Sequence, residues 1–300
     1  MKPILVTGAT GKMGGTGRHL THFLLKAGAP VRAMVRQMDD RSAELVKAGA
    51  EVVIGDFLDE DSLRGAMKGA GAAYFCAPVF DVLLHATTVF ALCAKEAGVD
   101  RIINVSQMGT KDPILSPATR LHRLSEMIFD WSGVPSSHLR ATVYLEQLTN
   151  IFGPAVRMRG ALVAPLNDQK VCMIAGADVA RVAAGIALHP DQFGAGPYHL
   201  TGPKNFNFAE VAETLSAALQ KKIAYIDIPP AEWKQTAIER GMTPHLAAHL
   251  DKLYEKGRLG RLDHTPTDIV ERVGGTPAVS LSQFINENVA AFSAPAAGTA

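Results

Sequence analysis

The sequence is poor in cysteine, in aromatic residues and in net charge. Among its 300 residues are three cysteines, 6% aromatic residues, and 30 Lys and Arg against 29 Asp and Glu, for a formal net charge of +1. The odd number of cysteines, none of them in a Cys-x-x-Cys pair, argues against a disulfide framework. The balanced charge leaves no basic surplus for the phosphates of a nucleic acid, so we expect no nucleic-acid partner.

Long apolar runs are also missing. The longest uncharged stretches, such as residues 82–94, fall short of the roughly 18 residues that a membrane span requires. The first residues form a short strand-like stretch that runs into glycines, which is unlike a secretory signal peptide. Nevertheless 47% of the residues are hydrophobic, enough for a large core. We therefore expect a soluble, cytoplasmic protein without a membrane partner.

The histidines do not form an established metal-binding motif. Ten are present; none forms a His-Glu-x-x-His pattern, and His245 and His249 are the one pair spaced as His-x-x-x-His. This spacing can place two imidazoles on one face of a helix, but a zinc site takes three or four protein ligands. We predict no metal site.

The first half of the chain alternates between strand-like and helix-like patterns. The expected strands are 3–7, 31–35, 51–54, 72–76, 101–105 and 136–141, and the expected helices are 14–26, 40–48, 60–67, 81–97 and 117–131. Such repeated units predict a doubly wound parallel sheet, an α/β NAD(P)-binding Rossmann fold. After about residue 150 this rhythm changes, and the last expected helix is 281–292, with Ser280 or Ser282 as its N-cap. We expect a Rossmann domain over 1–150, a smaller α+β substrate-binding region over 151–292, and a flexible tail over 293–300.

A glycine-rich turn between the first strand and the first helix is the strongest local signal. Its spacing is Gly8-x-x-Gly11-x-x-Gly14. In a dinucleotide-binding fingerprint, the first glycine permits a tight turn, the second a close approach to the pyrophosphate, and the third close helix packing. The helix N-terminus then offers unpaired N–H groups to the phosphate. A purely structural turn is the alternative. The predicted cofactor contacts in this turn are Gly8, Thr10, Gly11, Lys12, Met13 and Gly14.

The residue after the second strand bears on the choice of nucleotide. NAD-binding proteins usually place an acidic residue there, to bind the ribose 2′-hydroxyl. Here that position is Arg36, which favours a 2′-phosphate and hence NADP(H) over NAD(H). Lys12 and Arg41 add positive charge, whereas Asp39 and Asp40 count against the assignment. The alternative is that Arg36 is only a solvated cation at the end of a strand.

Two further strand ends supply candidate cofactor contacts. Asp56 follows the third strand and is expected to accept a hydrogen bond from the adenine amino group, while Phe57 packs on the ring. A cap or turn role is the alternative for Asp56, although Asp59 is better placed to cap the following helix. Ala77 and Pro78 follow the fourth strand and are expected to cover the ribose through backbone contacts.

Several segments together resemble a known family. They are TGATGKMGG, VRAMVR, GDFLDEDSL, HRLSE, SGVPSSHLRATVYLEQL and ADVARVAA. The chain is similar to the NmrA-like branch of atypical short-chain dehydrogenases, which includes quinone and triphenylmethane-dye reductases, phenylpropanoid reductases and catalytically silent redox-sensing regulators. The resemblance covers nearly the whole chain and is closest over 1–150. It implies a Rossmann domain with a smaller C-terminal substrate region.

The chain lacks the Tyr-x-x-x-Lys pair of ordinary short-chain dehydrogenases. None of its five tyrosines has a lysine four residues later. The resemblance instead assigns His122, in a His-x-x-x-Glu segment with Glu126, to the place of the lysine near the nicotinamide. Ser106 is expected to contact cofactor or substrate, and Tyr144 to line the nicotinamide pocket. The alternatives are a helix-surface histidine for His122 and a core-packed tyrosine for Tyr144.

These features support two functions of different classes. The first is an NADP(H)-dependent reductase that transfers hydride to a small conjugated acceptor, such as a quinone, a dye or a related aromatic carbonyl or enone. The second is a catalytically silent NADP(H)-binding sensor, which the missing Tyr-x-x-x-Lys pair supports. We favour the reductase, as a monomer or homodimer acting on a small molecule.

Overall fold

The computed structural model describes residues 1–11, 15–77, 82–110 and 116–293. The chain divides into two compact units, each built from three separate segments. The first unit comprises Met1–Ala141, Gly176–Leu200 and Asp268–Pro277. The second comprises Thr142–Ala175, Thr201–Thr267 and Ala278–Ala300. Each unit is described by itself.

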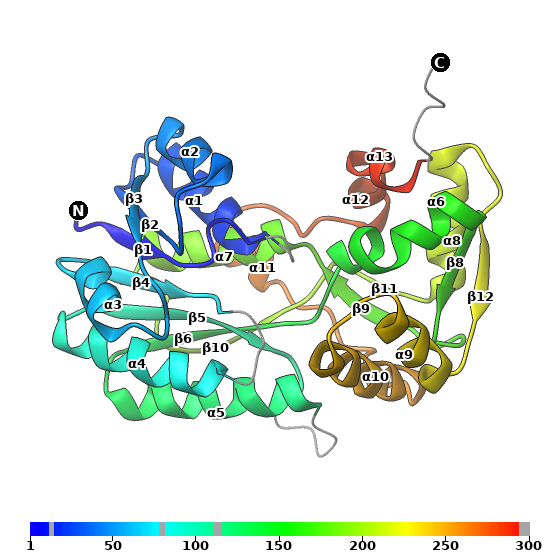
Figure 1. Ribbon diagram of the computed structural model, residues 1–300. Helices are drawn as coiled ribbons and strands as arrows, with labels where there is room; N and C mark the ends of the chain where they lie inside the picture. Colours follow the sequence, from blue (N-terminus) through cyan, green and yellow to red (C-terminus); the bar gives the residue numbers. More distant parts are fainter. Residues whose placement is uncertain (12–14, 78–81, 111–115, 294–300) are drawn as a thin grey trace. The chain divides into compact units, whose positions relative to one another are not determined.

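A parallel sheet forms the centre of the first unit (Figure 1). Within the described residues its strand order is β10-β6-β5-β4-β1-β2-β3, and every neighbouring pair is parallel. The strands are β1 (Ile4–Val6), β2 (Val31–Val35), β3 (Glu51–Ile54), β4 (Ala72–Phe75), β5 (Arg101–Gln107), β6 (Ser136–Ala141) and β10 (Gly196–Leu200). The first six strands follow the Rossmann order, which confirms the predicted fold class.

Helices cover both faces of this sheet. They are α1 (Thr16–Lys26), α2 (Asp40–Lys47), α3 (Glu60–Met67), α4 (Leu83–Glu96), α5 (Pro117–Ser132), α7 (Gly176–Leu188) and α11 (Ile269–Gly274). Figure 1 shows α1, α2, α7 and α11 on one face and α3, α4 and α5 on the other. Helix α7 packs against both α1 and α11, and α4 packs between α3 and α5. This double covering explains why the central strands are so apolar.

An aromatic cluster fills the core on the α3–α5 face. The rings of Phe75, Phe90 and Phe129 are buried and meet edge to face, with centroids 4.8 Å apart for Phe75 and Phe90 and 5.1 Å apart for Phe75 and Phe129. Edge-to-face contacts of this kind add to the free energy gained from burial alone. The cluster therefore fixes β4, which is followed by the candidate residue Ala77, and α5, which carries the candidate residue His122.

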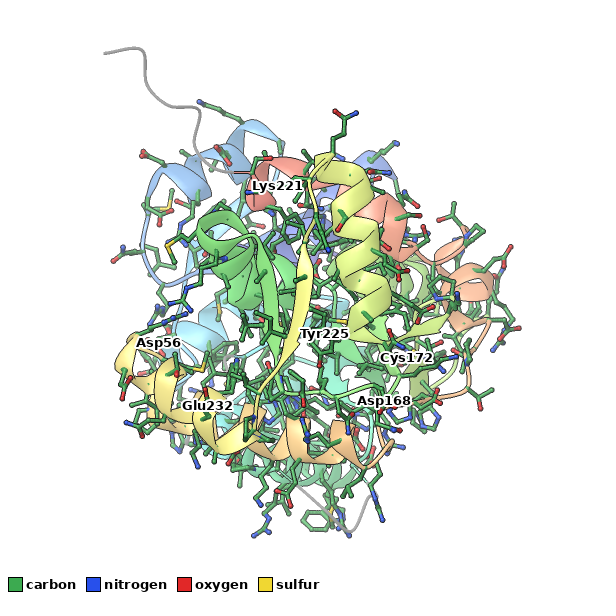
Figure 2. All side chains as sticks on the ribbon, turned by 90° about the vertical axis from the view of Figure 1, so that its right-hand side faces the viewer. Asp56, Asp168, Cys172, Lys221, Tyr225 and Glu232 are labelled. Carbon is green, nitrogen blue, oxygen red and sulfur yellow. The ribbon has the colours of Figure 1, made fainter. Side chains whose placement is uncertain are left out.

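The second unit has short strands and many helices. Its strands are β7 (Val143–Tyr144), β8 (Ala161–Ala164), β9 (Val171–Ile174), β11 (Asn205–Phe206) and β12 (Ala224–Asp227). Its helices are the π-helix η1 (Leu148–Phe152) and α6 (Gly153–Arg159), α8 (Phe208–Leu219), α9 (Pro230–Glu239), α10 (Pro244–Arg258), α12 (Leu281–Glu287) and α13 (Val289–Phe292). Figure 2 shows β12, with Tyr225 labelled, beside α8, and the two elements pack together.

The compact units differ from the contiguous ranges 1–150 and 151–292. Strand β10 pairs with β6 in the large sheet, and α7 packs on β5 and β6, although both follow residue 150 in sequence. Pattern along the chain does not reveal such pairing, because a strand's partner is chosen by tertiary contacts. Of the expected tail over 293–300, residues 294–300 lie outside the described residues.

Candidate functional site

The candidate site of the first unit lies where parallel strands end. The strand order reverses between β1 and β4, which are direct neighbours in the sheet. In open α/β sheets, ligands bind outside the carboxyl ends of the strands at such a switch point. The Thr7 hydroxyl joins the two ends, since it donates to the Tyr74 carbonyl at 2.8 Å and accepts from the Cys76 N–H at 3.0 Å.

The glycine turn follows β1 directly at this point. Gly8 has a φ of +68°, and a Cβ there would lie 3.0 Å from the Cys76 carbonyl oxygen. The Gly11 N–H donates to the Gly8 carbonyl at 3.0 Å and closes the turn. Lys12, Met13 and Gly14 lie outside the described residues. The turn is thus glycine-dependent at Gly8, as the motif predicts.

Gly17 is a close-packing glycine that the motif did not single out. It is the second residue of α1, and a Cβ there would lie 2.6 Å from the carbonyl carbon and oxygen of Gly8. A side chain would therefore push the helix away from the turn. In the sequence, Gly17 is one of two glycines beyond the three that the fingerprint needs.

The N-terminus of α1 carries no side-chain cap. Its N-cap residue, Gly15, has a φ of 57°, and the first turn holds no acidic residue. By contrast, α2 and α3 begin with Asp39 and Asp59, whose carboxylates accept backbone N–H groups. The predicted capping role of Asp59 is confirmed. The first N–H groups and the positive dipole end of α1 are therefore available to an anion.

The cation after β2 is exposed. Arg36 forms no ion pair within the part of the chain that the structure describes. The nearby Asp39 is engaged, because it caps α2 and pairs with Arg41 at 2.6 Å. The hydrogen bond from Arg41 lowers the pKa of Asp39. Arg41 also donates to the Thr10 carbonyl at 3.0 Å, which holds a second guanidinium against the glycine turn.

The residues after β3 and β4 have mixed roles. Asp56 is half-buried and accepts the Leu58 N–H at 2.9 Å, which is the turn role held open as its alternative. Phe57 is half-buried and meets Phe75 edge to face, with centroids 5.3 Å apart. Ala77 follows β4 and is half-buried, and Pro78 lies outside the described residues.

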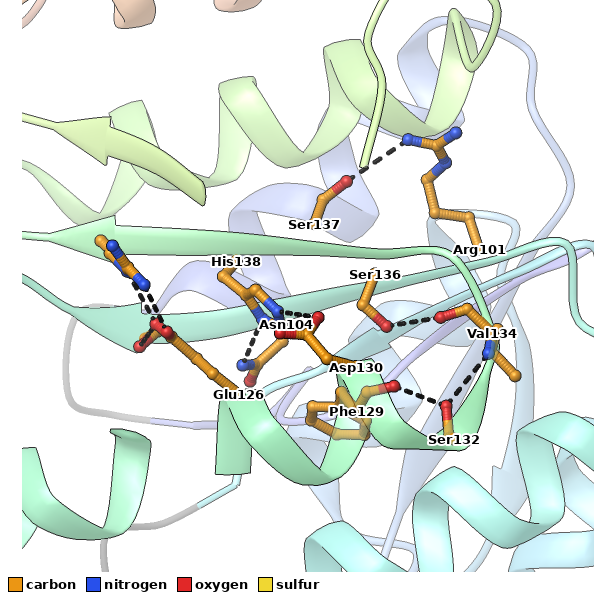
Figure 3. Close-up of polar contacts among 12 residues, drawn as sticks. Arg101, Asn104, Glu126, Phe129, Asp130, Ser132, Val134, Ser136, Ser137 and His138 are labelled. Atoms are coloured by element: carbon orange, nitrogen blue, oxygen red, sulfur yellow. Dashed lines mark hydrogen bonds and ion pairs between the residues drawn. The ribbon is translucent and has the colours of Figure 1, made fainter. Parts of the chain in front are cut away.

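A buried ion pair lies near the ends of β5 and β6. Glu126 reaches from α5 toward the sheet (Figure 3). There it accepts a hydrogen bond from Ser106 Oγ at 2.6 Å. Both nitrogens of a fork on Arg140 also donate to it, at 3.0 Å from Nε and 2.6 Å from Nη2. Burial alone would raise the pKa of Glu126, but the hydrogen bonds from Arg140 and Ser106 outweigh it and lower that pKa. The Glu126 side chain is therefore a fixed carboxylate.

His122 lies one turn before Glu126 and is buried, with 5% of its surface exposed. It is not a helix-surface histidine. Its Nδ1 is buried and has no hydrogen-bond partner within the described residues. Burial lowers the pKa of His122 to about 4, against the opposing pull of Glu126. The ring is therefore neutral near pH 7 and has one nitrogen ready for a ligand.

Two other findings concern Tyr144 and Arg140. Tyr144 is half-buried on β7 of the second unit, so its pocket-lining role stays a prediction. Arg140, which the sequence did not single out, is the main partner of Glu126. Its only signal was an arginine inside an otherwise buried strand, where an unpaired charge would be costly.

The described residues contain neither a membrane-spanning helix nor a cluster of metal-binding side chains. No described helix combines the length and apolar character that crossing a membrane demands. Over the same residues, no group of three or more His, Cys, Asp or Glu side chains is arranged to hold a metal ion.

Comparisons with known proteins agree with the resemblance seen in the sequence. The chain is 27% identical to an NAD(P)H azoreductase of Xenophilus azovorans over 291 residues, covering 97% of this chain and 99% of the relative. A triphenylmethane reductase of Citrobacter sp., solved with NADP(H), superposes with a TM-score of 0.82 at 24% identity, over 95% of this chain and 99% of that one. An NADPH-dependent quinone oxidoreductase of Escherichia coli, solved with NADPH, has the same TM-score and coverages at 22% identity. The model of the NmrA-like family matches residues 1–271, and the chain belongs to that family.

Proposed function

We propose that the protein is an NADPH-dependent reductase. The observation that carries this proposal is an uncapped helix N-terminus behind a glycine turn, at the strand switch point, beside the exposed Arg36. The family membership and the NADP(H)-binding relatives support it. So does the neutral, buried His122, which offers an open nitrogen near the end of the same sheet.

The described residues fit this cofactor. Gly8 and Gly17 let the turn pack closely against β4 and α1, and the first N–H groups of α1 would bind the pyrophosphate. Arg36 and Arg41 would bind a 2′-phosphate, whereas Asp39 is already neutralised by its ion pair. We keep Thr10, Asp56, Phe57, Ala77 and Ser106 as proposed contacts, together with Lys12, Met13, Gly14 and Pro78.

Hydride transfer depends more on how cofactor and acceptor are oriented than on acid–base catalysis. NADPH supplies a hydride when bound, and the protein supplies position and electrostatics. A neutral His122 would hold the nicotinamide ribose or a substrate oxygen by a hydrogen bond. Glu126 is committed to Arg140 and Ser106, so it is not a free acid or base.

For the acceptor we propose a small conjugated molecule, such as a quinone, a triphenylmethane or azo dye, or an aromatic carbonyl or enone. Holding a flat acceptor against the cofactor supplies much of the rate for such a reaction. We propose that the second unit contributes the substrate region, with Tyr144 in the pocket. We also propose a cytoplasmic monomer or homodimer, which cell fractionation and gel filtration test.

The test is NADPH consumption by the purified full-length chain with one acceptor of each class. We expect turnover with at least one class, and less with NADH. His122→Gln should lose most of this turnover, while its affinity for NADPH should fall by no more than the loss of one hydrogen bond, about 1 kcal/mol. Binding of NADPH without turnover on any acceptor would favour the silent sensor instead.

A further inference from the structure

Both oxygens of the Glu126 carboxylate accept hydrogen bonds from the sheet. It receives Ser106 Oγ from β5 and the Arg140 fork from β6, and these two residues are direct partners in the strand register. Oε1 accepts two of the three hydrogen bonds and Oε2 accepts the shortest one from Arg140. A bidentate arginine fixes both the position and the plane of a carboxylate.

His122 lies one helical turn earlier on the same face of α5. A histidine and a glutamate four residues apart are close enough to interact. A buried imidazole beside a carboxylate would ordinarily donate a hydrogen bond to it, because a buried polar atom without a partner is costly. Here Nδ1 of His122 is buried and unpartnered among the described residues. The partner that this nitrogen would otherwise have is Glu126, which is held by Ser106 of β5 and Arg140 of β6.

The other charged and titratable groups around Glu126 and His122 belong to three elements. On β6, His138 contacts Glu126 electrostatically and bonds to Asp130 of α5 at 3.0 Å. On β10, His199 lies 3.3 Å from Arg140 Nη1. On α5 the remaining charges are Asp130 itself and the exposed Arg120 and Arg123. Arg140 is thus the cation that meets Glu126 directly in the described structure.

We infer that Arg140 is a positioning residue for the proposed reaction: together with Ser106 it holds the Glu126 carboxylate away from His122, so that Nδ1 of His122 stays open for cofactor or substrate. This inference rests on the proposed function for its consequence, but its structural part concerns only these four side chains. Arg140 touches neither reactant and acts through Glu126. Burial keeps His122 neutral, and the ties from Arg140 and Ser106 limit the opposing pull of the Glu126 carboxylate.

The test compares Arg140→Met with the conservative Arg140→Lys. The titration of the His122 ring is followed by NMR in the protein without cofactor, with His122→Gln to assign its signal. In Arg140→Met the unpaired Glu126 is free to pair with His122, and the midpoint seen at the His122 ring should rise by about one pH unit or more. Arg140→Lys keeps the charge and should shift it less. The acidic limb of kcat/KM should move with the NMR midpoint.

Ser106→Ala provides a milder variant in case Arg140→Met does not fold. It removes one neutral donor to Glu126 and should move the His122 midpoint upward by a smaller amount. The inference is overturned if the His122 midpoint stays at its wild-type value in the folded variants. Because NMR needs no turnover, this result is separate from a failure of the proposed function, which would appear as missing NADPH oxidation in the wild-type protein.

Discussion

The carboxyl ends of β1 and β4 present mainly backbone groups, whereas those of β5 and β6 present charged side chains. At β1 and β4 the surface is backbone: glycines at Gly8 and Gly17, an uncapped helix and a carbonyl that a Cβ would crowd. At β5 and β6 it is charged side chain, with Glu126 held by Arg140 and Ser106. Backbone N–H groups suit a phosphate, which needs many donors at close range. A reacting group needs one fixed side chain, which a buried network provides.

The largest expected effect is on the side-chain end. Arg140→Met leaves the Glu126 carboxylate buried and unpaired, so the free energy of unfolding should fall by about 3–5 kcal/mol. Arg64→Met is the matched control, because Arg64 pairs with three carboxylates at the surface and its loss should change stability little. Urea denaturation of both variants measures the difference. Equal losses of stability in the two variants would mean that burial does not determine how much the Arg140–Glu126 ion pair contributes to stability.

The stability of the protein should fall in acid because His122 is buried in its neutral form. Its pKa in the folded protein is lowered to about 4, so the unfolded chain binds more protons between about pH 6.5 and pH 4. Stability should therefore fall as the pH falls through that window, by about 3 kcal/mol in total. His122→Gln should remove this slope and keep the loss at lower pH that comes from Glu126, whose pKa is also lowered. Denaturation curves at several pH values measure both, and an unchanged slope in His122→Gln would reject the assignment.

The backbone end can be tested with one added methyl group. Gly17→Ala places a Cβ 2.6 Å from the Gly8 backbone, so the turn must shift, at a cost of about 2–3 kcal/mol and with weaker NADPH binding. Gly65→Ala is the control, since Gly65 is exposed in α3 with no atom within 4 Å of a Cβ, and it should stabilise by about 0.5–1 kcal/mol. Thermal melts and NADPH titration read out the two variants. Unchanged stability and NADPH affinity in Gly17→Ala would show that the phosphate-binding turn does not require a glycine at this position.

The smallest expected effect concerns the choice between cofactors. Arg36→Ala removes the exposed cation after β2 and should weaken NADPH by about 2 kcal/mol, close to 30-fold, while NADH changes little. Calorimetric titration with both nucleotides measures this. Equal losses for the two would show that Arg36 does not contact the 2′-phosphate.

Local signals predicted the backbone end well and the side-chain end poorly. Gly8, the Asp59 cap and the strand Val31–Val35 each depend on a few neighbouring residues, and the structure has them as predicted. Arg140 and Ser106 meet Glu126 only because β5 and β6 pair in a given register. That register depends on contacts between distant parts of the chain. The spacing of His122 and Glu126 therefore pointed to these two residues but not to the groups that hold Glu126.

Prediction was weaker in the second unit for a related reason. Strands β7 and β11 have two residues each, too few for a periodic pattern, and neither was predicted. The expected last helix over 281–292 is interrupted at Asn288, which caps α13 and whose side chain donates to the Phe284 carbonyl at 2.8 Å. The predicted N-cap at Ser280 or Ser282 is resolved in favour of Ser280, which accepts the Gln283 N–H at 3.2 Å.

The interleaving of the two units has a consequence for synthesis on the ribosome. The first unit includes Asp268–Pro277, whose helix α11 packs on α7 so closely that a Cβ at Gly185 would meet the Val273 carbonyl at 2.1 Å. The nascent chain must therefore leave the ribosome at least as far as Pro277 before this unit can close. Contacts of such long sequence separation slow folding and prolong the exposure of the apolar strands. A gene fragment ending near residue 150 would lack β10, α7 and α11, and should require a chaperone or aggregate.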